Sequence, residues 1–233
     1  MSDKNLQLKK RNRLSLLKQS LQDNINEKGV IATFQKILKH ISYKIKGIDF
    51  SEEELSKFTI ESKNKNLATI HGSCGDEMLH MLLDEVIKFD QTVLRGSFLD
   101  YGSGKGMAVI YAKKYGFKKV IGVEFAKELC DIANKNIKKI GLSDIEIFYM
   151  DATEFIPSKG VRVIYFLNPF HERVLHEVLI KILKYKQIFL QDIYLIYNIP
   201  IYEQVFDKLS EFQKLTTCKY KDNKAHIYKL EVQ

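Results

Sequence analysis

Residues 97–136 read SFLDYGSGKGMAVIYAKKYGFKKVIGVEFAKELCDIANKN, and this stretch decides the fold. An apolar pair at 98 and 99 is followed by glycines at alternate positions from Gly102 to Gly106, and a helical pattern of apolar residues begins at Met107. This order predicts a strand, a tight turn and a helix. A second apolar run, 120–123, ends in Glu124, which lies 20 residues after Gly104. The stretch therefore predicts a strand–helix–strand unit that binds a nucleotide.

The glycines of the turn have a physical purpose. Without a Cβ atom the backbone can adopt positive φ and lie against a ligand, and the N–H groups at the start of the next helix face that ligand. Glu124, at the carboxyl end of the second strand, is placed to accept hydrogen bonds from both hydroxyls of a ribose. The sixth position of the fingerprint G-x-G-x-x-G is Met107 rather than a small residue. This favours an adenosine derivative over a dinucleotide.

The pattern D-x-G-x-G-x-G resembles the first motif of the class I S-adenosylmethionine (SAM)-dependent methyltransferases. The resemblance implies that SAM is the cofactor and S-adenosyl-L-homocysteine the product. It also implies that Glu124 holds the ribose, and that four residues of the turn hold the methionine part of SAM: Asp100, Gly102, Gly104 and Gly106. A glycine-rich turn in another kind of α/β protein, with Glu124 at a solvated strand end, is the alternative.

Three further residues are predicted to contact the cofactor. A strand expected over 145–149 leads to Asp151 and Ala152. In class I methyltransferases an acid at this place accepts the adenine amino group and the next backbone N–H meets a ring nitrogen, so the resemblance implies these roles here. Asp151 can also cap the following turn. Ser73, in the loop before a helix expected over 76–89, is predicted to cap that helix and to contact SAM.

The rest of the chain predicts a Rossmann-like α/β fold. Apolar strands are expected over 161–167 and 187–193, helices over 126–140, 171–185 and about 201–212, and a terminal hairpin of 214–219 with 225–232. This order resembles the class I fold, which implies a seven-strand, mostly parallel sheet with a C-terminal antiparallel hairpin. Two helices are predicted in the N-terminal part: a basic amphipathic helix over about 1–28, and a helix with an apolar face from Ile31 to Ile45. Residues 1–70 are therefore predicted to form an N-terminal helical extension, and residues 71–233 a methyltransferase domain.

The loops 71–76, 168–171 and 197–200 are expected to converge on the reacting methyl group, and four of their residues are predicted as catalytic: Asn168, Pro169, Phe170 and Tyr197. Asn168 is expected to accept a hydrogen bond from the nucleophile. Phe170 and Tyr197 are expected to wall an apolar channel that lowers the pKa of an incoming amine.

The loop motifs are most similar to those of the non-SET histone-lysine methyltransferases, although the early loop lacks the expected acid and the Asn-x-Phe loop carries Pro169. The resemblance implies methyl transfer to a nitrogen or oxygen acceptor, with a protein lysine or other amine favoured. A small-molecule or glycan acceptor is the alternative. The alternative from another functional class is a partner protein that binds SAM but does not catalyse methyl transfer.

Composition sets the remaining expectations. The 233 residues carry a formal net charge of +8, which permits a nucleic-acid partner, but no nucleic-acid-binding module is visible. No apolar run reaches the length of a membrane span and no signal peptide is visible, so a cytoplasmic protein without a membrane partner is expected. The three cysteines share no metal-like spacing, so no metal site is expected.

Overall fold

The computed structural model describes residues 76–232 continuously, together with residues 41–51, Asn64 and scattered positions between 15 and 39. The chain divides into two compact units, Met1–Ile48 and Asp49–Gln233. The predicted boundary between residues 70 and 71 lies outside the described residues, as does Ser73. The predicted extension and domain bounds therefore stay a prediction.

The second unit is built on a seven-stranded sheet in the order β3-β2-β1-β4-β5-β7-β6. Strands β1 to β5 are parallel, and β7 runs antiparallel to both β5 and β6. The prediction of a mostly parallel seven-strand sheet with a C-terminal antiparallel hairpin is confirmed. The strands are β1 (Ser97–Tyr101), β2 (Lys119–Glu124), β3 (Ile145–Tyr149), β4 (Val161–Leu167), β5 (Ile193–Asn198), β6 (Phe212–Tyr220) and β7 (Asn223–Leu230).

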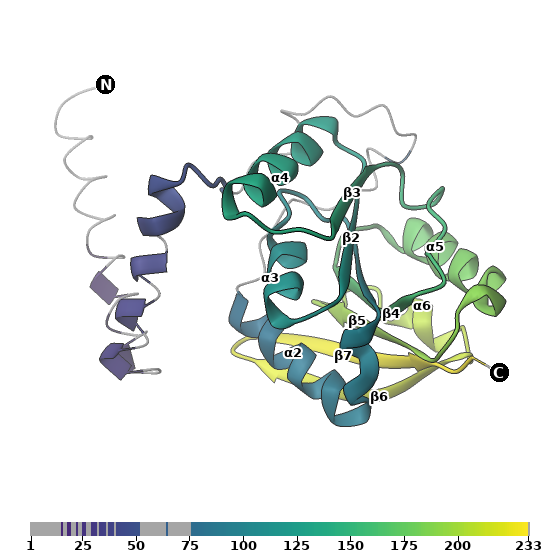
Figure 1. Ribbon diagram of the computed structural model, residues 1–233. Helices are drawn as coiled ribbons and strands as arrows, with labels where there is room; N and C mark the ends of the chain where they lie inside the picture. The colour runs from purple at the N-terminus through teal and green to yellow at the C-terminus, as the bar shows by residue number, and fades with distance from the viewer. Residues whose placement is uncertain are drawn as a thin grey trace, which may run out of the picture. The chain divides into compact units, whose positions relative to one another are not determined.

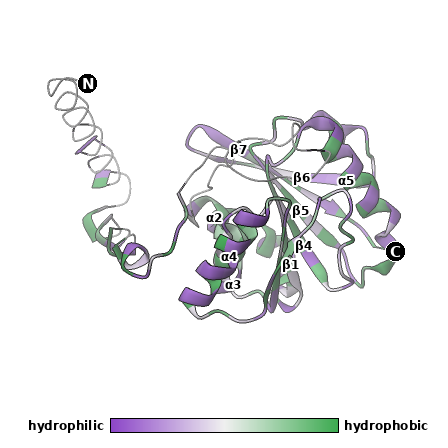
Figure 2. Ribbon diagram, turned by 90° about the horizontal axis from the view of Figure 1, so that it is seen from above, coloured by the Kyte–Doolittle hydropathy of each residue, from purple (hydrophilic) through white to green (hydrophobic). Residues whose placement is uncertain are grey.

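Helices cover both faces of this sheet (Figures 1 and 2). One face carries α2 (Asp76–Phe89), α3 (Met107–Tyr115) and α4 (Lys127–Ile140), and the other carries α5 (Glu172–Lys184) and α6 (Gln204–Asp207). Two short 3-10 helices, η3 (Gln91–Arg95) and η4 (Lys186–Ile188), precede β1 and β5. Because both faces are covered, β4 is buried along nearly its whole length, as its apolar sequence predicts.

Two apolar cores lie on opposite sides of the sheet. On one side Val174, Val178 and Ile182 of α5 pack with Ile164 and Phe166 of β4. On the other side residues of α2 and α3, including Leu82, Val86 and Val109, pack with Val163 and Tyr165 of the same strand. Alternate residues of β4 thus feed the two cores, which holds the parallel strands in register.

The fifth strand and the helix after it differ from the predictions. β5 occupies 193–198 instead of 187–193, and the predicted helix over 201–212 is reduced to the four residues of α6. Two apolar runs stand next to each other here, and Leu190 of the first run is exposed, whereas every residue of β5 is buried. Apolar pattern alone cannot choose between such runs. Tyr197 consequently belongs to a strand and not to a loop.

The parallel arrangement places five loops at one edge of the sheet. The segments that follow β1, β2, β3, β4 and β5 all begin at carboxyl ends of parallel strands. In open α/β sheets ligands bind in the crevice at this edge. Most of the predicted site residues lie in these segments, so the fold gathers them. In the described part of the chain, no helix has the length and apolar character needed to span a membrane.

Truncation of β4 should show how far stability depends on this double core. Ile164 is fully buried between sheet and helices, so Ile164→Ala is expected to lower the free energy of unfolding by about 2–5 kcal/mol. The matched control is Ile180→Ala on α5, where the side chain is exposed and the loss should stay below about 0.5 kcal/mol. Urea unfolding followed by circular dichroism measures both, and equal losses would contradict the assigned core.

Candidate active site

The glycine turn joins β1 to α3 and touches the predicted catalytic loop. Gly102 has φ +82°, and a Cβ atom there would lie 2.7 Å from the Pro169 Cβ. Gly106, at the N-terminus of α3, has φ +83°, and a Cβ atom there would lie 3.1 Å from the Ala133 Cβ. Only glycine combines positive φ with such close approach. The turn therefore lies directly beside the loop after β4 and leaves no room for larger residues.

Glu124 closes the turn from the end of β2. Its side chain is buried; Oε1 accepts hydrogen bonds from the N–H groups of Phe125 and Ala126, and Oε2 accepts one from the N–H of Gly104, all at 2.9 Å. Burial raises the pKa of Glu124, and these three hydrogen bonds oppose the rise. A carboxylate has about four acceptor positions. In this arrangement Oε2 keeps one position for a ribose hydroxyl, whereas the sequence predicts contacts with both hydroxyls.

Asp100, in β1, places a second carboxyl group next to the first. The residue is 3% exposed. Burial, with a smaller contribution from the negative charge of Glu124, raises the pKa of Asp100 to about 8. Two buried carboxyl groups so arranged favour a proton or a positively charged ligand. The pair is therefore suited to a cation at the carboxyl edge of the sheet.

Lys105 anchors the glycine turn to the start of the second unit. Its side chain is 1% exposed, and Nζ donates to Asp49 Oδ2 at 2.8 Å and to Ser51 Oγ at 2.9 Å. Burial raises the pKa of Asp49, but the hydrogen bonds from Lys105 and Ser51 outweigh it and lower the pKa to about 2. Asn136 of α4 bonds to the backbone of both Asp49 and Lys105. Sequence analysis missed this network; its one signal is the lysine inside the glycine turn.

Asp151 has the capping role that its position predicts. Its Oδ1 accepts hydrogen bonds from Thr153 N at 2.8 Å and Thr153 Oγ1 at 2.7 Å. Its Oδ2 accepts a hydrogen bond from Asn64 Nδ2 at 3.0 Å, and Arg173 Nη2 lies 3.5 Å from Asn64 Oδ1. Ala152 beside it is buried. Asn64 was not predicted, and no motif marks it, yet it lies against the acid expected to bind adenine.

The loop after β4 has a constrained geometry. Asn168 has φ +39°, a conformation that Asn tolerates better than most residues. Tyr197 OH accepts a hydrogen bond from Tyr202 N at 3.2 Å and donates one to Asn168 Oδ1 at 3.4 Å. The carbonyl side of the Asn168 amide therefore faces Tyr197.

Tyr197 and Phe170 differ in their surroundings. Tyr197 is fully buried in β5, and burial raises its pKa to about 12. The hydroxyl is therefore protonated at neutral pH. Tyr197 lies in β5 and not in a loop as predicted, and it contacts Asn168; its catalytic role stays a prediction. Phe170 is partly buried, and its ring meets Phe166 edge to face at 6.5 Å.

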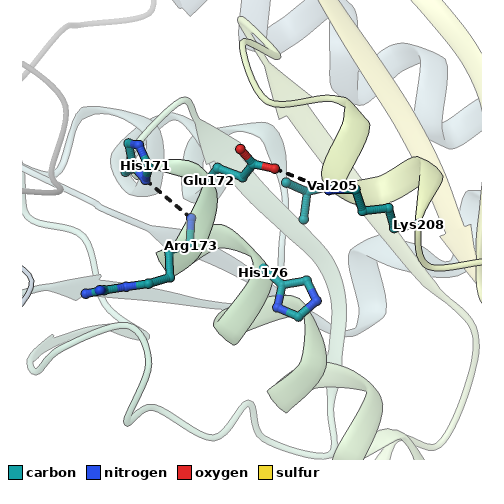
Figure 3. A pocket seen from close by; sticks show the side chains of 6 residues that line it. All are labelled: His171, Glu172, Arg173, His176, Val205 and Lys208. Carbon is teal, nitrogen blue, oxygen red and sulfur yellow. Dashed lines mark hydrogen bonds and ion pairs between the residues drawn. The ribbon is translucent and has the colours of Figure 1, made fainter.

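A pocket of about 320 Å³ follows this loop at the start of α5. Figure 3 shows its lining residues, four of them basic: His171, Glu172, Arg173, His176, Val205 and Lys208. His171 caps α5 by accepting a hydrogen bond from Arg173 N at Nδ1, and Glu172 lies 3.5 Å from Lys208 Nζ. With neutral histidines the lining residues thus carry a net charge of +1 beside the loop, and Arg173 Nε also lies 3.8 Å from Glu177 Oε1. Among the residues that the structure describes, no group of three or more His, Cys, Asp or Glu could hold a metal ion.

Comparison with known proteins gives a family and a fold. Residues 81–229 match the family model described as Conserved hypothetical protein 95. The ribosomal protein L11 methyltransferase of Clostridium perfringens is 32% identical over 78 residues, which are 34% of this chain and 23% of that protein. The chain thus spans about a quarter of the length of the curated relatives that it matches.

Solved structures of methyltransferases share the fold. The ribosomal protein L11 methylase of Lactobacillus delbrueckii subsp. bulgaricus aligns with 71% of this chain and 82% of its own, at 20% identity and a TM-score of 0.52. An RNA methyltransferase of Salinibacter ruber, in complex with S-adenosyl-L-homocysteine, aligns with 70% of this chain and 95% of its own chain, at 15% identity and a TM-score of 0.51. The class I methyltransferase fold is confirmed, and the predictions of a methyltransferase and of SAM agree with these names. The histone-lysine subgroup finds no support in them.

The raised pKa of Asp100 predicts a stability that depends on pH. The folded chain holds this proton up to about pH 8, whereas an unfolded Asp releases it near pH 4, so the wild type should lose stability as the pH rises from about 4 to about 8. Asp100→Asn is therefore expected to be more stable than the wild type at pH 9, by more than about 1.4 kcal/mol, and nearly equal to it at pH 4.

Urea unfolding at the two pH values measures this difference. Asp222→Asn, in the exposed turn of the hairpin, is the matched control and should follow the wild type at both. An Asp100→Asn variant no more stable than the wild type at pH 9 would show that the buried carboxyl group is not destabilising.

Proposed function

The chain belongs to the Conserved hypothetical protein 95 family, and we propose that it is a SAM-dependent methyltransferase that acts on a nitrogen acceptor. The observation that carries the proposal is the buried pair of Asp100 and Glu124 beside a glycine turn. SAM bears a sulfonium and an ammonium group, and two buried carboxyl groups are the complement of such a cation.

Further polar groups of the site fit the rest of SAM. Asp100 and the glycine turn would hold the methionine part, Oε2 of Glu124 a ribose hydroxyl, and Asp151 with Ala152 the adenine. Asp151 Oδ2 would share its lone pairs between Asn64 and the adenine amino group. When bound, SAM supplies an electrophilic methyl group that a positioned nucleophile can take.

The loop after β4 favours nitrogen over oxygen as the acceptor atom. The Asn168 carbonyl oxygen can accept a hydrogen bond from an amino group but cannot remove a proton from a hydroxyl group. Tyr197, with its pKa near 12, is also no base at neutral pH. A neutral amine or planar nitrogen needs orientation more than it needs a base. The site therefore supports transfer to nitrogen, with Asn168 and Phe170 as the residues that would orient it.

The basic pocket next to this loop favours an acceptor with an anionic group near the methylated nitrogen. His171, Arg173, His176 and Lys208 line it, and only one acidic residue, Glu172, stands among the lining residues. Nucleotides in RNA carry a phosphate beside every base, so RNA is the first acceptor class that we propose. A protein amine is the second, supported by the name of the L11 methyltransferases, and cytoplasmic location stays a prediction.

Asn168 gives a direct test of the proposed orientation. Asn168→Gly removes the side chain and tolerates φ +39°, so it should lower kcat by roughly 10²-fold and leave the Kd for SAM within about twofold, because Asn168 is not among the groups expected to hold SAM. Turnover to S-adenosyl-L-homocysteine and calorimetric SAM binding measure the two quantities. Unchanged turnover would exclude Asn168 from the reaction.

The acceptor class is tested by incubating the chain with methyl-labelled SAM and the RNA and protein fractions of a host extract. We expect label in RNA that nuclease releases and protease does not. The double variant His176→Gln, Lys208→Gln, which keeps the Arg173 contact to Asn64, should lower this labelling at least tenfold without changing SAM binding. Label released by protease instead would favour the protein amine, and label in neither fraction would contradict a macromolecular acceptor.

A further inference from the structure

The net charge of the chain is confined to its first unit. Residues 1–48 hold 11 of the 37 Lys and Arg and 3 of the 29 Asp and Glu, which gives +8. Residues 49–233 hold 26 basic and 26 acidic residues and are neutral. From Lys28 to Ile48 the sequence has no acidic residue at all. A partner attracted by charge would therefore be anionic and would meet the first unit.

This basic unit contains a well-formed helix. The described residues between 29 and 45 are helical, and Thr33 Oγ1 donates to Gly29 O at 2.9 Å. The helix ends at Gly47, which has φ +63°, and Ile48 N donates to Tyr43 O at 2.8 Å. A left-handed glycine with this backward hydrogen bond is a strong C-terminal stop.

The helix exposes its apolar face. Ile31 is 77% exposed, Phe34 58% and Ile45 81%. At 100° per residue the exposed apolar residues fall within a stripe of about 120°. They are Val30, Ile31, Phe34, Ile37, Leu38, Ile41 and Ile45. Thr33, outside the stripe, is buried.

Lysines flank this stripe. Lys39, Lys44 and Lys46 lie outside it on the same helix, and both Lys44 and Lys46 are exposed. An apolar stripe with lysines along its sides is typical of helices that lie in the interface of a membrane, where acyl chains cover the apolar residues and anionic headgroups neutralise the lysines. Nucleic acid would neutralise the lysines but would leave seven apolar side chains in water.

We propose that residues 29–46 form an interfacial helix that binds this methyltransferase to the surface of an anionic lipid bilayer. The binding adds apolar burial to electrostatic attraction, and it leaves the neutral catalytic unit in water. It is independent of the acceptor, since no residue of the active site takes part. The sequence, which contains no apolar run long enough to span a membrane, predicts no membrane partner.

Sedimentation with lipid vesicles tests the proposal on the full chain. We expect the wild type to bind vesicles of phosphatidylcholine with 30–40% phosphatidylglycerol at least tenfold more tightly than vesicles of phosphatidylcholine alone. The double variant Phe34→Gln, Ile41→Gln should lower binding to anionic vesicles at least tenfold. The control Gln35→Ala, Ser42→Ala, at positions just outside the stripe and also without change in charge, should stay within about twofold. SAM binding should be unchanged in both.

The charged flank has its own test. Lys39→Gln, Lys44→Gln, Lys46→Gln should lower binding to anionic vesicles roughly tenfold or more and leave the weak binding to neutral vesicles nearly unchanged.

The proposal would be overturned if the wild type did not bind anionic vesicles, or if the apolar variant and its control lost vesicle binding equally. It would also be overturned if the chain bound polyuridylate but not vesicles. A dimer that dissociates on the substitutions Phe34→Gln and Ile41→Gln, in a chain that does not bind vesicles, would overturn it as well.

Discussion

Two carboxyl groups buried at the ends of neighbouring strands are the constraint on which the catalytic unit depends. Asp100 and Glu124 sit on β1 and β2, which pair in parallel, so the sheet itself brings their charges together. The two carboxyl groups differ in their surroundings. Three backbone N–H groups donate hydrogen bonds to Glu124. Burial raises the pKa of Asp100 to about 8. The fold thus keeps an unfavourable group in place, as functional sites commonly do.

The surrounding structure holds this pair rigidly. Gly102 lies against Pro169, and Gly104 bonds to Glu124, so the turn is fixed on two sides. Lys105 and Asn136 then tie the turn to Asp49 and Ser51. The ion pair between buried Lys105 and half-exposed Asp49 adds little net stability, because desolvation of the lysine offsets the attraction. It does restrict the turn to one conformation, which a cofactor site requires.

Sequence reasoning succeeds where the signal is local and fails where contacts are distant. The turn from Asp100 to Gly106 and strand β4 carry their information in adjacent residues, so both were predicted. The predicted position of β5 is wrong because an apolar run that is only partly buried precedes the fully buried strand, and burial is a tertiary property. Asp49 and Lys105 are 56 residues apart, and Asn64 and Asp151 are 87 apart. No periodicity or spacing links such pairs, so only the folded chain reveals them.

The central claim is that the buried carboxyl pair holds SAM, with Asp100 binding its cationic methionine part and Glu124 a ribose hydroxyl. Calorimetric titration of the chain with SAM, repeated at pH 6, 7 and 8 in buffers of different ionisation enthalpy, tests it most directly. A cation held by Asp100 requires that carboxyl group to lose its proton, so the account predicts proton release on binding and an affinity that rises with pH up to about 8. Tight SAM binding without proton release or pH dependence would contradict it.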